Sequence, residues 1–265
     1  MSLSHAERAE LVRLASTPPD ARTGIHHLAW LYRQFGAHGA AEVTTAIAEA
    51  THNFPGSPMY FSGFIAGTDS QGFRAELVDP LLSNPQTGHF FSYVAWALDG
   101  VSDLEYAAAI GHELFPDPLD DAAHSTQMAR GMLHAAAFRR IVVHQPMTPT
   151  GQLDYIALDI ALNTEGWNAT TLEPWAHAWL PTWHMDDGWQ ERDLYTGNSM
   201  QDLRCTVAAL VFGNIVHAGG FHSAGQAAAW LDANVLDHRH AAAGPSSTPT
   251  SPRPSARPVP GPRLG

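Results

Sequence analysis

The residues best suited to acid–base chemistry lie in the motif Gly111-His112-Glu113. The motif puts an imidazole next to a carboxylate in the last turn of a predicted helix, shortly before Pro116. A carboxylate there faces the negative end of the helix dipole, and the two apolar residues that follow it reduce its hydration. Both effects raise the pKa of a carboxylic acid, which favours general acid catalysis. We therefore predict Glu113 as a general acid or base; an exposed or salt-bridged helix-end glutamate is the alternative.

A second glycine–histidine pair, Gly88-His89, lies near the start of another predicted helix. Glycine before each histidine lets a backbone or a substrate approach closely. We predict that His89 and His112 position the substrate or a water, or bind a metal. His89 also fits a hydrogen-bonded core histidine, because three aromatic residues share its helix. The zinc motif His-Glu-x-x-His is absent, since no histidine lies three residues after Glu113.

A divalent metal such as zinc is a candidate cofactor, because the chain contains 16 histidines. The candidate ligands are His89, His112, Asp117 and His124. Asp117 has a competing structural role, since it precedes Pro118 where a helix is expected to begin and fits the N-cap.

Two further groups of residues are candidates for binding a substrate. Asn198, Ser199 and Asp202 surround the predicted start of a helix, where a substrate, a water or an anion can be held. The same residues also suit helix capping. Trp175, Trp179 and Trp183 are spaced by one helical turn, so their indoles can form one stripe. Such a stripe stacks sugars or bases or binds a partner, and it equally suits packing between helices.

These residues together predict a hydrolase with Glu113, His112, His89 and Asp202 as its catalytic group. A glycosidase or muramidase-like enzyme would use Glu113 with a second carboxylate, and the tryptophans would stack the sugar. A metal-dependent phosphoesterase would use the histidines. The alternative from another class is a non-enzymatic helical module that binds a protein partner.

Composition excludes several mechanisms. All 14 basic residues are arginines, so a P-loop lysine, a Schiff-base lysine and a serine–lysine dyad are absent. The net charge of −12 makes nucleic-acid binding unfavourable. The single cysteine, Cys205, lies in an apolar helix and suits a reducing compartment. Neither a signal peptide nor a membrane-spanning segment is apparent, so we expect a cytoplasmic protein.

The pattern of apolar residues predicts an all-α fold. We expect one helical domain over 1–243 with an irregular, loop-rich insertion at 53–82, and a disordered Pro/Arg/Ser-rich tail over 244–265 that can dock a protein partner. Helices are expected over 6–15, 23–35, 38–52, 85–98, 103–114, 118–143, 151–164, 170–180, 199–217 and 223–236.

Overall fold

The structure, a computed structural model, describes residues 2–16, 24–51, 72–78, 86–98, 100, 139–144, 147–164 and 200–238. These residues form helices and turns and contain no β-strand, which confirms the predicted all-α class. Two isolated β-bridges link Phe73 to Leu236 and Met147 to Leu153. Within the same residues, no helix is long and apolar enough to cross a membrane.

Three helices form the N-terminal part of the fold: α1 (His5–Ser16), α2 (Gly24–Gln34) and α3 (Ala40–Thr51). α1 packs against α3 and α2. It begins with a reciprocal cap between Ser4 and Glu7. The Ser4 backbone N–H donates to the Glu7 carboxylate at 2.8 Å, and the Glu7 N–H donates to the Ser4 hydroxyl at 3.3 Å.

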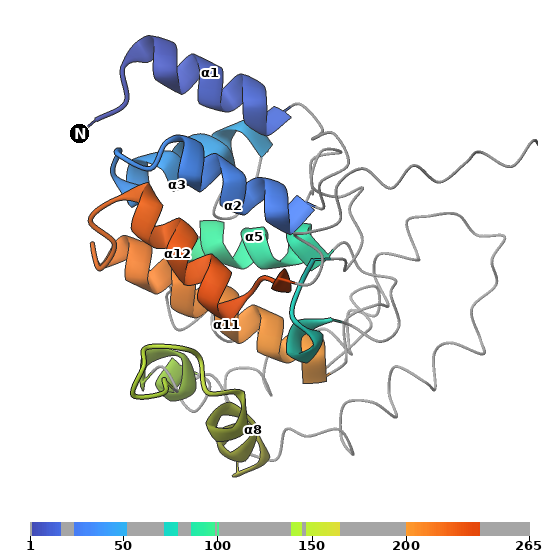
Figure 1. Ribbon diagram of the computed structural model, residues 1–265. Coiled ribbons are helices and arrows are strands. Elements are labelled where there is room, and N and C mark those ends of the chain that lie inside the picture. The colour runs from blue at the N-terminus through green and yellow to red at the C-terminus, as the bar shows by residue number, and fades with distance from the viewer. Residues whose placement is uncertain are drawn as a thin grey trace, which may run out of the picture.

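The C-terminal helix α12 (Ala224–Asn234) packs against α2 and α3, so both ends of the described chain share one core (Figure 1). The Gly225 N–H donates to the Gly36 carbonyl at 3.0 Å. A Cβ at Gly225 would lie 3.2 Å from that same oxygen, so glycine permits the close approach. Arg33 forms an ion pair with Asp232 across the same interface.

The central helices are α5 (Gln86–Ala97) and α11 (Met200–His217), which lie side by side (Figure 1). α5 is buried on almost all sides, as expected of a helix that is apolar around most of its circumference. The short 3-10 helix η1 (Ala75–Leu77) packs against α11, and α8 (Tyr155–Thr164) lies beyond α11 at the edge of the fold.

The helix bounds agree with the sequence prediction to within one or two residues, except at α8. That helix begins at Tyr155, four residues later than expected, because residues 147–153 form a turn closed by a β-bridge. Asp154 then caps α8: its carboxylate accepts the backbone N–H groups of Ile156 and Ala157. Residues 139–144 are helical, one residue past the end of the helix expected over 118–143, and the rest of that expected helix lies outside the described residues. The predicted helices 103–114 and 170–180 lie outside the described residues.

Candidate functional site

α5 and α11 run parallel to each other. His89 in the first turn of α5 contacts Thr206 in the second turn of α11. Further along, Gly213 of α11 lies against Val94 and Ala97 of α5. At the C-terminal ends, the imidazole of His217, the last residue of α11, is 2.8 Å from the carbonyl oxygen of Leu98, which directly follows α5. Because residue numbers increase together along both helices, their first turns lie at the same end of the pair.

Gly213 determines how closely the two helices approach. A Cβ at this position would lie 2.4 Å from the Ala97 Cβ and 2.9 Å from the Val94 carbonyl oxygen. Both distances are too short for van der Waals contact, so only glycine fits this backbone arrangement.

His89 is buried between α5 and α11, with 1% of its surface exposed. Its Nε2 lies 2.7 Å from the Thr206 hydroxyl oxygen, and its ring meets the edge of Tyr93 at 5.0 Å between centroids. This is the hydrogen-bonded core environment that we gave as the structural alternative. The contact with Thr206 also connects the Gly88-His89 motif directly to α11.

Polar side chains are unusually common on the buried surface of α5. The buried polar residues of α5 are Gln86, Thr87, His89 and Ser92. Thr206 of α11 is also buried and contacts His89. Burying a polar group costs free energy unless it finds a hydrogen-bond partner, so such residues rarely gather in a core by chance. The first turn of α5 is therefore the most polar part of the interior that the structure describes.

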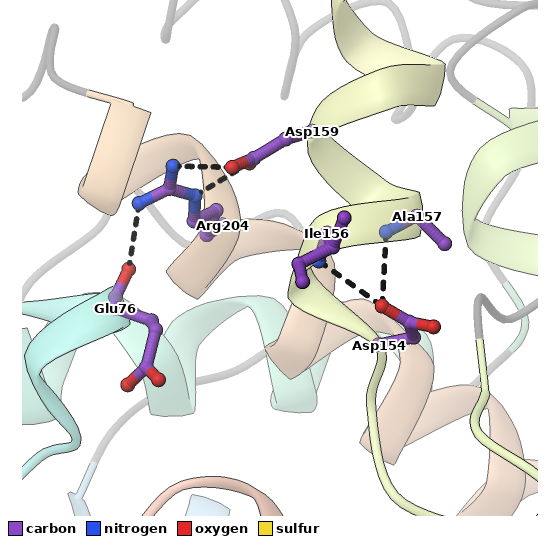
Figure 2. Close-up of polar contacts among 6 residues, drawn as sticks. All are labelled: Glu76, Asp154, Ile156, Ala157, Asp159 and Arg204. Carbon is purple, nitrogen blue, oxygen red and sulfur yellow. Dashed lines mark hydrogen bonds and ion pairs between the residues drawn. The ribbon is translucent and has the colours of Figure 1, made fainter.

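An arginine network lies next to this end of α11. Arg204 donates two parallel hydrogen bonds to the Asp159 carboxylate of α8, each 2.7 Å long. Its third contact is the Glu76 carbonyl oxygen in η1, at 3.3 Å (Figure 2). The planar guanidinium matches a carboxylate in this bidentate geometry. Arg204 thereby joins α8, η1 and α11.

Tyr155 and Asn234 extend these polar contacts to α12. The Tyr155 hydroxyl donates to the Asn234 carbonyl at 2.6 Å, and the Leu153 N–H donates to the Asn234 side-chain oxygen at 2.6 Å. Arg74 lies over the Tyr155 ring, 5.7 Å from its centroid. Burial raises the pKa of the Tyr155 phenol, so the hydroxyl stays protonated at neutral pH and donates its hydrogen bond.

Two of the predicted catalytic residues fall on described elements. His89 lies in the first turn of α5, as above. Asp202 belongs to the first turn of α11, although its side chain is outside the described part of the structure. Because Asp202 and Thr206 are four residues apart on one helix, both positions are on the same face of α11. That face meets α5 at His89.

The other predicted site residues lie outside the described residues: His112, Glu113, Asp117, His124, Trp175, Trp179, Trp183, Asn198 and Ser199. Within the described ranges, no group of three or more His, Cys, Asp or Glu residues is arranged to hold a metal ion.

Sequence reasoning missed Thr206, Asp159 and Arg204. One signal was available for the last two, because each is a charged residue within a mostly apolar stretch of helix. Such a residue needs a partner when its helix packs, but the sequence does not identify that partner. Cys205, next to Arg204, is buried.

Comparisons of the chain with protein-family models, with curated proteins and with solved structures find no match.

Proposed function

We propose that the protein is a hydrolase whose centre lies at the end of the fold where α5 and α11 begin. The observation that supports this proposal is the parallel packing of the two helices. It brings the first turn of α5, which carries His89, to the same end as the first turn of α11, which carries Asp202. Both turns were predicted from sequence to belong to the site, for independent reasons.

In this proposal Glu113 is the general acid or base, and His112 positions a water or the substrate. His89 acts through its bond to Thr206, which holds α5 in register with α11. Asn198, Ser199 and Asp202 close the site at the start of α11, and the tryptophans at 175, 179 and 183 contact the substrate. A metal bound by histidines remains part of the phosphoesterase form of the proposal.

Glu113→Gln is the test of this mechanism. A panel of chromogenic phosphoesters and glycosides first identifies the hydrolysed class. Glu113→Gln is then expected to lower kcat/KM by about 100-fold or more, because general acid–base catalysis contributes on that scale. Glu10→Gln, a change of an exposed glutamate in α1, is the matched control and keeps full activity. Unchanged activity in Glu113→Gln would contradict the mechanism.

Metal content separates the two enzyme subclasses. Mass spectrometry of the full chain, purified without chelator or histidine tag, is expected to detect near-stoichiometric zinc or manganese if the protein is a metallo-phosphoesterase. His112→Ala should then remove the metal. A metal-free protein that cleaves glycosides would identify the glycosidase subclass instead.

A non-enzymatic, self-associating module is the second candidate, and one observation favours it. Ile156 and Ile160 are 76% and 63% exposed and lie one turn apart on α8. The one charged residue of α8, Asp159, is paired with Arg204, so this face adds little repulsion between two copies of a chain with net charge −12. Sedimentation should then detect a dimer that Ile156→Asp disrupts. A monomer at all concentrations would contradict this candidate.

A further inference from the structure

We draw no further inference here: the strongest candidate, the cluster of buried polar side chains around His89 and Thr206 between α5 and α11, belongs to the site already described.

Discussion

At the scale of single residues, the most informative contact is the ion pair between Arg204 and Asp159. Arg204 is 17% exposed and Asp159 is 35% exposed, so the pair is neither fully buried nor fully solvated. Exposed ion pairs contribute about 0–1 kcal/mol, whereas removing one partner of a buried pair costs about 3–5 kcal/mol. The bidentate geometry and the additional bond to Glu76 favour a cost between these limits.

Asp159→Asn is therefore expected to lower the free energy of unfolding by about 1–2 kcal/mol. The loss arises because the Arg204 guanidinium, which is largely enclosed, keeps its charge and loses its carboxylate. Urea denaturation measures the change, provided that the m-value is unchanged. Glu10→Gln breaks the exposed Glu10–Arg13 pair of α1 and should cost less than about 0.5 kcal/mol. Equal effects of the two substitutions would refute this account.

At the scale of elements, the geometry of the candidate site depends on how α5 meets α11. The contact at Gly213 is tight because a Cβ there would overlap the Ala97 Cβ and the Val94 carbonyl. On helix propensity alone, replacing glycine by alanine in a helix stabilises it by about 1 kcal/mol. Overpacking a close helix contact costs about 1–3 kcal/mol, so we expect the steric effect to be larger.

Gly213→Ala should thus destabilise the protein, despite the better helix propensity of alanine. The overlap with the Ala97 Cβ disappears in an Ala97→Gly background, so the cost of Gly213→Ala should be smaller there. A double-mutant cycle measured by urea denaturation gives this coupling directly. If the effects of the two substitutions on the free energy of unfolding are additive, the contact between residues 213 and 97 does not limit the approach of α5 to α11.

The start of α1 gives a prediction about pH. The hydrogen bond from the Ser4 hydroxyl, followed by that from the Ser4 backbone N–H, lowers the pKa of the Glu7 carboxyl below its ordinary value of 4.5. A lowered pKa in the folded state means that the cap stabilises the protein above pH 4.5 and is lost as pH falls through the lower pKa. Glu7→Gln keeps the cap geometry without titrating, so it should reduce the loss of stability in acid.

The comparison is made from urea midpoints of the two proteins, measured from about pH 6 to about pH 3. The original chain should lose more of its midpoint over this interval than Glu7→Gln does. Parallel curves would mean that the Ser4–Glu7 cap has no share in the acid sensitivity.

At the scale of the whole molecule, the C-terminal helix α12 packs against the N-terminal helices α2 and α3. Its contacts with α2 and α3 include the Gly225–Gly36 hydrogen bond and the Arg33–Asp232 ion pair. Trp230 of α12 also packs against Phe212 of α11. The N-terminal helices therefore need α12 to complete the core into which their apolar faces pack.

A chain that ends after His222 should consequently fail to fold cooperatively, because it lacks α12 and leaves the apolar faces of α2 and α3 without a partner. A chain that ends after Ala243 should keep the original unfolding midpoint, since the residues it lacks are mainly proline, serine, arginine and glycine. Circular dichroism during thermal unfolding distinguishes the two cases. Cooperative unfolding of the shorter chain would show that α12 is dispensable.

The helices themselves were predictable from the sequence. The bounds of α1, α2, α3, α5, α11 and α12 follow from local signals: apolar residues three and four apart, and capping residues such as Ser4 and Ser223. These signals act within one helical turn, so they can be recognised without knowing the fold. The late start of α8 was missed because the Met147–Leu153 bridge competes with a helical first turn.

The arrangement of the site was decided by the tertiary structure. His89 was a candidate from its motif, but its partner Thr206 is 117 residues away, and Asp159 is 45 residues from Arg204. No periodicity or spacing in the sequence indicates that α5 and α11 are parallel or which residues face each other. That pairing depends on the fit of two complete helix surfaces, with Gly213 allowing the closest contact. Local sequence determines where each helix begins and ends, whereas packing between distant segments determines which helix ends come together.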